Sequence, residues 1–257
     1  MSYIDGFVIA VPTANKEKFI EHAQRGDAVF MEYGATRIVE CWQDNVEKGH
    51  TTDFFGAVDC KEDESVAYSW IEWPDKAARQ AVMGRMDELA ESDDRFNPEK
   101  NPMPFDGMRM IYGGFQPLVE EGEPVSGAYV QGFIVPVPEG NKQAYREAAM
   151  GMWEIMKDYG ARRVIEAWQD DVPPGKQTDF FRSVKAESGE IVVFSFVEWS
   201  SREACDAAHD KMMQDERMKK FMDENPDVKP PFDGRRMVYG GFRPVVELAE
   251  SLGGASR

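Results

Sequence analysis

The sequence predicts an α+β fold in which one βαββαβ unit is present twice in 257 residues. Two observations carry this prediction. Long strings recur about 126 residues apart, and each copy alternates strand-like and helix-like segments in the same order. That order is the ferredoxin-like pattern, in which helices cover one face of a four-stranded sheet and leave the other face bare. Two such units in one chain can bury their bare faces against each other.

The repeats are long and specific. YIDGFVIAVPTANK returns as YVQGFIVPVPEGNK, YGATRIVECWQDNV as YGARRVIEAWQDDV, and PFDGMRMIYGGF as PFDGRRMVYGGF. A period of this length is too long for a solenoid and indicates gene duplication of a whole domain. We predict a first repeat at 1–121, a linker at 122–128, a second repeat at 129–248 and a tail at 249–257. The junction EEGEPVSG is polar and contains Gly and Pro, as a linker should.

The first half of each unit is predicted from periodicity and end signals. Tyr3–Val11 alternates and is rich in β-formers, so it should be a strand. Asn15 can cap a helix that runs to about Tyr33 and stops at Gly34. A second strand is predicted at Thr36–Gln43.

The second half of each unit is predicted in the same way. We expect a short strand or hairpin arm at Thr52–Cys60 and a strong strand at Val66–Trp73, which Pro74 ends. A helix should follow over Asp75–Glu91, then a proline-rich loop. Met108–Phe115 should be the last strand, closed by two glycines.

Composition limits the classes of function. With 30 basic and 47 acidic residues the formal net charge is −17. Nucleic acids and anionic membranes select basic patches, and the chain has no cluster of four or more basic residues, so we expect neither partner. Cys41, Cys60 and Cys205 fit neither a disulfide framework nor a zinc site, and the N-terminus lacks a signal peptide's basic segment. We therefore expect an acidic, soluble, cytoplasmic protein.

The strings DGFV, RIVECW, TDF, IEWP and PFDG carry a family resemblance. Across Tyr3–Glu120 and Tyr129–Glu247 the chain resembles the YbaA-like family of uncharacterised proteins, whose members are about one repeat long. The resemblance implies an intramolecular dimeric α/β barrel and no established activity. One departure is Gln131, where the family and the first repeat (Asp5) have Asp. The wider superfamily includes small oxygenases, chlorite-dismutase-like haem proteins, isomerases and stress-response binding domains, which is an analogy of fold.

Side chains alternate between the two faces of a strand, so each strand offers two sets of residues. We predict that small residues lie beneath the helices and that aromatics and carboxylates point between the sheets, a composition typical of small-molecule pockets. The candidate catalytic residues are Glu40, Glu72 and Asp5. The candidate ligand-binding residues are Trp42, Trp70, Tyr112, Phe7, Glu166, Trp168, Glu198 and Tyr239.

Two interpretations of the carboxylates remain open. Burial raises a carboxyl pKa, so these groups can act as general acids or bases near neutral pH. Alternatively, they accept hydrogen bonds from Tyr and Trp or pair with Arg at the barrel ends. Two arginine pairs, Arg37/Arg163 and Arg109/Arg236, are predicted on the helix side as structural partners of Asp53/Asp179 or Asp106/Asp233.

No metal or cofactor is predicted. His22, His50 and His209 form no ligand-spaced pair, and no glycine-rich loop precedes a helix in the phosphate-binding manner.

Two function hypotheses follow. One is an enzyme of oxygenase, isomerase or lyase type that acts on a small organic ligand inside the barrel. The other is a non-catalytic module, ligand-binding or stress-related. We expect a monomeric pseudo-dimer or a low-order homo-oligomer. Because Asp5 becomes Gln131 and Trp70 becomes Phe196, any chemistry is predicted to belong mainly to the first half; drift in a non-catalytic core is the alternative.

Overall fold

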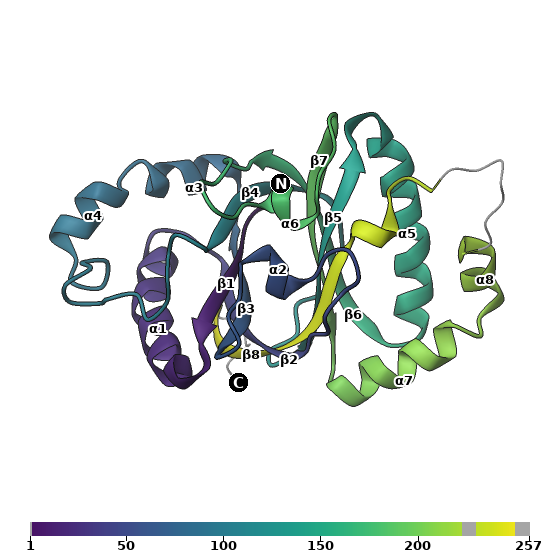
Figure 1. Ribbon diagram of the computed structural model, residues 1–257, viewed down its shortest axis with the longest axis horizontal. Helices are drawn as coiled ribbons and strands as arrows, with labels where there is room; N and C mark the ends of the chain where they lie inside the picture. The colour runs from purple at the N-terminus through teal and green to yellow at the C-terminus, as the bar shows by residue number, and fades with distance from the viewer. Residues whose placement is uncertain (1, 223–229, 250–257) are drawn as a thin grey trace, which may run out of the picture.

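The computed structural model describes residues 2–222 and 230–249 and shows a closed, eight-stranded antiparallel barrel with helices outside it (Figure 1). The strand order around the barrel is β1-β3-β2-β8-β5-β7-β6-β4. The predicted fold class is therefore confirmed: two βαββαβ units pack as an intramolecular α/β barrel.

Within the described residues, the two halves have the same order of strands and α-helices. The strands are β1 (Tyr3–Pro12), β2 (Arg37–Asn45), β3 (Glu64–Trp73), β4 (Ile111–Gly122), β5 (Tyr129–Pro138), β6 (Ala161–Asp171), β7 (Glu190–Trp199) and β8 (Val238–Ala249). The helices are α1 (Lys16–Glu32), α2 (Phe54–Ala57), α3 (Lys76–Met83), α4 (Met86–Ser92), α5 (Lys142–Asp158), α6 (Phe180–Ser183), α7 (Arg202–Met212) and α8 (Glu216–Met222). Short 3₁₀ turns cover Thr13–Asn15, Glu139–Asn141 and Gly234–Arg236.

Three predicted elements differ from the structure. The segment Thr52–Cys60 is not a strand but contains α2, because the Asp53 carboxylate accepts a hydrogen bond from the Gly56 N–H at 2.6 Å and caps a helical turn. The helix predicted at Asp75–Glu91 is divided into α3 and α4. The last strand does not end at its two glycines, since β4 continues to Gly122.

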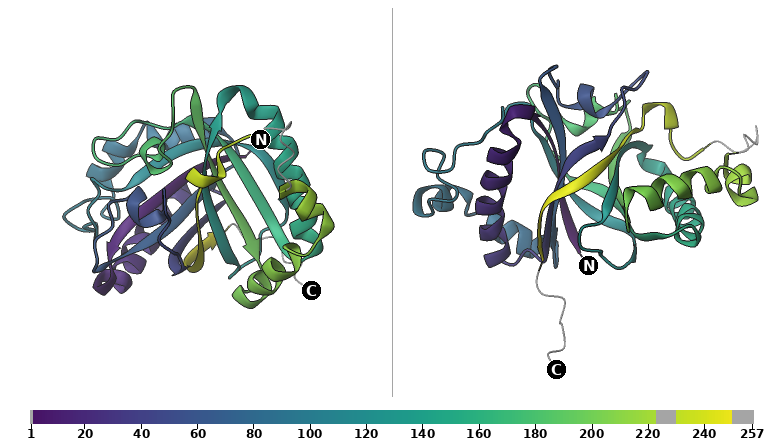
Figure 2. Two further views of the ribbon diagram at one scale, coloured as in Figure 1. Left: turned by 45° about the vertical axis from the view of Figure 1, so that its right-hand side comes forward. Right: turned by 90° about the horizontal axis from the view of Figure 1, so that it is seen from below.

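The long C-terminal strands close the barrel. In each half the last strand pairs with the first strand of its own repeat and then with the second strand of the other repeat, as β2–β8 and β4–β6. Helices α1, α3 and α4 lie on one side of the barrel, and α5, α7 and α8 lie on the other (Figures 1 and 2). Within residues 2–222 and 230–249 we find no helix that combines the length and the hydrophobicity of a membrane span.

Stacked aromatic side chains fill the barrel interior. Tyr68 and Phe194 stack with ring centroids 4.7 Å apart, and Trp70 and Phe196 stack at 4.0 Å. These four side chains are fully buried, so the two halves share one core layer. A Cβ atom added at Gly6 would lie 2.7 Å from the Phe194 ring, so this layer has no space for even one extra methyl group.

That packing overturns the predicted faces of two strands. Gly6 pairs with Trp70 and Val39 also pairs with Trp70, and directly paired residues share a face. The small face of β1 and the Val39 face of β2 therefore point into the barrel. The prediction placed them beneath the helices. Large rings on β3 and β7 require small residues opposite them, and hydrophobic periodicity alone does not show which face is inside.

The two ends of the barrel differ in chemistry. At one end α2 and α6 insert Phe54 and Phe180 into the interior core. At the other end the apolar layer stops at Ile4, whose partner on β3 is Glu72. This second end carries charged residues and is crossed by the segment that joins the two halves.

Candidate functional site

The charged end is formed by residues near the ends of β2, β3, β6 and β7. Arg37 opens β2 and pairs with Glu72 on β3, and Arg163 pairs with Glu198 in the second half. Each of the four lies two positions along its strand from a residue of the interior core, and residues two apart share a face, so all four side chains point to the barrel axis. The predicted helix-side location of Arg37 and Arg163 is wrong for the same reason as the face of Val39.

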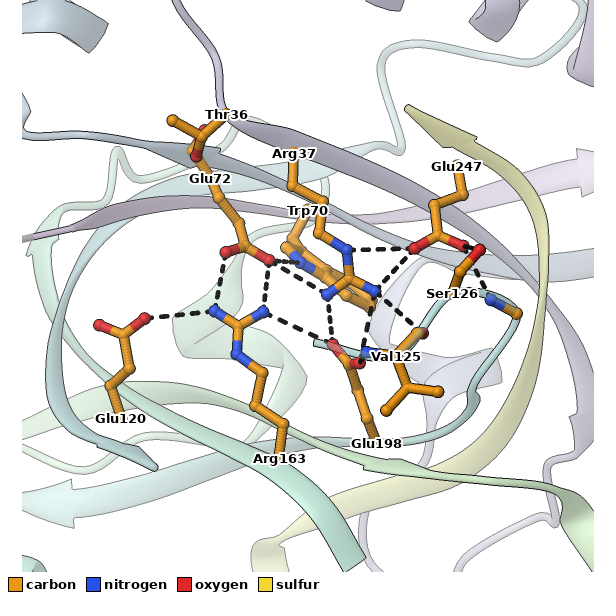
Figure 3. Close-up of polar contacts among 11 residues, drawn as sticks. Thr36, Arg37, Trp70, Glu72, Glu120, Val125, Ser126, Arg163, Glu198 and Glu247 are labelled. Carbon is orange, nitrogen blue, oxygen red and sulfur yellow. Dashed lines mark hydrogen bonds and ion pairs between the residues drawn. The ribbon is translucent and has the colours of Figure 1, made fainter. Parts of the chain in front are cut away.

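The arginines pair across the two halves. Arg163 donates from both terminal nitrogens to the two Glu72 oxygens, each at 2.8 Å. Arg37 donates in the same way to Glu198, with Nη2 3.3 Å from Oε2. Within its own half, Arg37 Nη1 lies 3.4 Å from Glu72. Each guanidinium group therefore joins strands of both repeats in a two-pronged ion pair (Figure 3).

Two further carboxylates complete the group. Glu247 on β8 accepts from Arg37 Nη2 at 2.9 Å, and Glu120 on β4 accepts from Arg163 Nη2 at 3.2 Å. We call the six residues Arg37, Glu72, Glu120, Arg163, Glu198 and Glu247 the mouth cluster. Two guanidinium groups face four carboxylates, so the mouth cluster has an excess of negative charge.

The linking segment makes the mouth asymmetric. The Val125 N–H donates to Glu198 at 2.9 Å, and the Gly127 N–H donates to Glu247 at 2.8 Å. Ser126 adds a hydroxyl hydrogen bond to Glu247 at 3.1 Å. These bonds hold the segment against the Arg37 side of the mouth (Figure 3).

A pocket of about 440 Å³ lies on this side, and we call it the mouth pocket. Its lining combines polar and apolar groups: Thr36, Arg37, Glu72, Pro124, Ser126, Glu247 and Ala249. Arg37 and Glu72 form a nearly buried polar floor, with side chains 6% and 9% exposed.

Electrostatics fixes the charge of Glu72. Burial alone would raise its pKa, but the hydrogen bonds from Arg163 and the charges of Arg163 and Arg37 outweigh burial and lower the pKa below its ordinary value. Burial alone would lower the pKa of Arg37, but the carboxylates of Glu198, Glu72 and Glu247 outweigh burial and raise it. Glu72 is therefore an ionised acceptor at neutral pH and a poor proton donor.

The structure divides the predicted site residues into three groups. Glu72, Glu198 and Trp70 point into the barrel as predicted, and Trp70 Nε1 donates to Glu72 at 3.0 Å. The inward prediction is wrong for six residues that lie on the outer face of the sheet beneath helices: Asp5, Phe7, Glu40, Trp42, Glu166 and Trp168. It is also wrong for Tyr112 and Tyr239, which are 47% and 60% exposed.

The misplaced carboxylates are buried among structural partners. Asp5 accepts from Trp73 Nε1 at 2.9 Å and from Arg79 Nε at 3.0 Å. Burial raises the pKa of Asp5 to about 6, against the opposing charge of Arg79. Glu40 accepts from the Ser69 hydroxyl, and burial raises its pKa to about 7.

In the second half, Glu166 accepts from the Tyr145 hydroxyl at 2.7 Å. Burial raises the pKa of Glu166 to about 7. The contacts of Asp5 and Glu166 match the alternative interpretation of the carboxylates, hydrogen bonding to Tyr and Trp and pairing with Arg, whereas Glu40 has a serine partner.

Arg109 and Arg236 are structural, but with different main partners than predicted. Arg109 donates to both oxygens of Glu64 at 2.6 Å and to Asp106 at 3.0 Å. Arg236 repeats this arrangement with Glu190 and Asp233. The partners Asp106 and Asp233 are as predicted, whereas Asp53 caps α2 instead.

Sequence reasoning missed Glu120 and Glu247 as site residues. The signal was present in the repeats, since QPLVE in the first half returns as RPVVE in the second. Their role could not be seen before the cross-half pairing of β4 with β6 and of β8 with β2 was known.

Comparison with known proteins decides the family. The model of a protein family of unknown function, DUF1428, matches residues 2–107 and 128–234. The chain belongs to this family. It is 50% identical over 119 residues to the uncharacterized protein YbaA of Escherichia coli K12, a match that covers 46% of this chain and 97% of YbaA. The YbaA of Shigella flexneri matches equally well. As the resemblance implied, this DUF1428 chain is similar to two YbaA-like units in tandem.

Solved structures share the fold of this DUF1428 chain. A protein described as a candidate monooxygenase from Lactobacillus acidophilus NCFM superposes with a TM-score of 0.59 at 13% identity, covering 96% of each chain. An anthrone oxidase-like protein gives a TM-score of 0.59 at 13% identity, covering 99% of this chain and 97% of the other. At such identity the likeness shows the fold alone.

Proposed function

We propose that this chain is a small-molecule-binding protein whose ligand occupies the mouth pocket and not the barrel interior. The observation that carries the proposal is a pocket of about 440 Å³ with a floor of nearly buried charged side chains. Its volume lies within the ~300–1,000 Å³ range of ligand sites, which combine apolar walls with a few fixed polar groups. Here Pro124 and Ala249 supply apolar wall, and Arg37, Glu72 and Glu247 supply the polar groups.

Binding without acid–base catalysis has more support than the predicted catalytic roles. Of the three candidate catalytic residues, only Glu72 lines the pocket, and its lowered pKa makes it a poor proton donor. Asp5 and Glu40 have raised pKa values but lie on the opposite face of the sheet. A role for either in chemistry at the mouth would need a path through the sheet.

An oxygenase or oxidase activity is the second candidate, supported by the names of the fold neighbours. Its test is dioxygen uptake by the full chain with anthrone as the probe substrate. Uptake above the buffer rate, lost when the mouth pocket is blocked, would favour the enzyme over the binding module.

The duplication supplies a matched pair of variants for testing the site. Thr36 lines the pocket, whereas the equivalent residue of the second half is the exposed Arg162. Thr36→Arg places a long side chain and a positive charge in the pocket wall at a position where its repeat tolerates arginine. Arg162→Thr makes the reverse change outside the pocket.

The experiment is ligand-observed NMR on the full chain with a fragment library of small amines, alcohols and carboxylic acids. We expect fragments that bind the unchanged protein and Arg162→Thr with equal affinity and bind Thr36→Arg at least tenfold more weakly. The proposal fails if no fragment binds, or if Thr36→Arg binds the same fragments as well as the unchanged protein does.

A further inference from the structure

We infer that the mouth pocket selects small organic cations, with a primary ammonium group carried on a compact apolar body. The inference rests on the proposed function, because it names the ligand class of the same pocket. Two independent observations carry it: the side-chain donors of the wall are already used, and the surrounding charge is negative.

The donors of Arg37 are all engaged within the protein. Its three nitrogens make six hydrogen bonds, to the carboxylates of Glu72, Glu198 and Glu247 and to the carbonyl oxygen of Val125. Since a guanidinium group has five N–H bonds, none remains for a ligand. Arg37 therefore shapes the pocket floor without being available to hold an anion.

The two hydroxyl groups of the pocket wall also donate their hydrogens within the protein. Thr36 Oγ1 donates to the Glu72 carbonyl oxygen at 3.1 Å, and Ser126 Oγ donates to Glu247 at 3.1 Å. Each hydroxyl keeps lone pairs for a ligand donor. Pro124 has no N–H. The side chains of the pocket thus offer acceptors, and a ligand rich in N–H groups complements them.

Glu72 has acceptor capacity left on the oxygen that is not shared between the arginines. Its Oε2 receives one side-chain hydrogen bond, from Arg163 at 2.8 Å, whereas Oε1 receives three. A carboxylate oxygen accepts two hydrogen bonds without strain. This atom is the strongest candidate partner for a ligand ammonium group.

Charge points to the same class of ligand. The mouth cluster holds four carboxylates against two guanidinium groups, and all three carboxylates paired with Arg37 compete for its single positive charge. A ligand ammonium would reduce this excess, whereas a ligand carboxylate would add to it in a partly buried site where charges interact strongly. The apolar contacts of Pro124 and Ala249 complement a hydrocarbon body.

The test uses three probes of one shape and different charge: cyclohexylmethylamine, cyclohexylmethanol and cyclohexanecarboxylate. Dissociation constants are measured by NMR titration of the full chain at low and high salt. We expect the amine to bind at least tenfold more tightly than the alcohol, the carboxylate not to bind, and the preference to shrink at high salt. Shifts should map to Thr36, Ser126 and Ala249.

Glu247→Gln tests the charge with little change of shape. It should weaken amine binding at least fivefold and leave alcohol binding within twofold. Glu121→Gln removes an exposed carboxylate outside the cluster and controls for net charge. Thr36→Arg is a second variant should Glu247→Gln lose its fold.

The outcomes separate the two proposals. Equal or tighter binding of the alcohol or the carboxylate at these residues overturns the cation class and leaves the binding site standing. Absence of all three probes from the mouth, together with an empty fragment screen, overturns both.

Discussion

Asp27 is a buried carboxyl group without a hydrogen-bond partner for its Oδ2 atom among the described residues. It lies on α1, and burial together with the charge of Glu40 raises its pKa well above the ordinary value. The equivalent position of the second half holds Trp153 in place of Asp27. There the buried carboxylate, Glu166, accepts a hydrogen bond from Tyr145. The first half therefore buries two carboxyl groups that cannot both ionise at low cost.

This pair predicts a pH-dependent stability. Because the folded pKa values are raised, the folded state binds protons more tightly than the unfolded state, and stability falls as pH rises from about 4.5 toward 7. Asp27→Asn removes one charge and should stabilise the protein by about 2 kcal/mol at pH 8. The gain should shrink toward pH 4. Urea unfolding at the two pH values measures it.

Asp94→Asn is the control, since this carboxylate is 75% exposed and should change stability by less than 0.5 kcal/mol or so at either pH. A gain from Asp27→Asn that is equal at both pH values would contradict the linkage.

At the scale of the element, strand β1 needs a residue without a side chain at position 6. Gly6 faces the Phe194 ring, which is held by Tyr68 on one side and by Phe115 and Phe180 on others. Because these rings surround it, the Phe194 ring has no room to move away from a larger residue at position 6. A β1 strand with ordinary side chains at this position would push the two halves apart.

Gly6→Ala should therefore destabilise the protein by about 1–3 kcal/mol through overpacking. Gly151 on α5 is the matched control, because a Cβ there meets open space. Gly151→Ala should be neutral or stabilise by about 0.5–1 kcal/mol, since Ala is the better helix former. Thermal unfolding of both variants decides the matter; equal effects would show that the interior layer is looser than described.

The type of each element was predictable where the hydrophobic periodicity was strong. Which face of a strand points into the barrel was less predictable. The strands around Ile4 and Trp70 and the helix that ends before Gly34 follow from periodicity and end signals. The division of β1 into inner and outer faces did not, because which face is inside depends on the partner ring from the other half. Short α2 was missed because the Asp53 cap acts through backbone geometry that alternation does not reveal.

At the scale of the whole molecule, the two halves share one barrel and one interior core. Strands β2 and β4 of the first half each complete their ladders only with β8 and β6 of the second. The rings of Trp70 and Phe196 lie in contact across the halves. Loss of either half would expose the aromatic layer of the other.

We accordingly expect one unfolding transition for the chain. Far-ultraviolet circular dichroism and tryptophan fluorescence should give coincident curves, since both halves contain tryptophan, and the calorimetric and van 't Hoff enthalpies should agree. Two resolved transitions would show that the repeats unfold independently.

The site was less predictable than the fold. Glu72, Glu198 and Trp70 were placed correctly in the interior, while Arg37 and Arg163 were assigned to the wrong face. The pocket depends on the linking segment around Val125, whose path over the mouth no periodicity describes. The repeat boundaries at 1–121 and 129–248 and the cytoplasmic location stay predictions.

The seating of the linking segment on one side of the mouth has a consequence for stoichiometry. A barrel assembled from two separate single-repeat chains would present two identical sides and therefore two equivalent binding places next to each other. In this chain the backbone of Val125 and Gly127 bonds to the carboxylates of one side, and the pocket residue Thr36 corresponds to Arg162 in the second repeat. For the ligand site proposed above we therefore expect one site per molecule, with saturation at one equivalent and no cooperativity between neighbouring ligands.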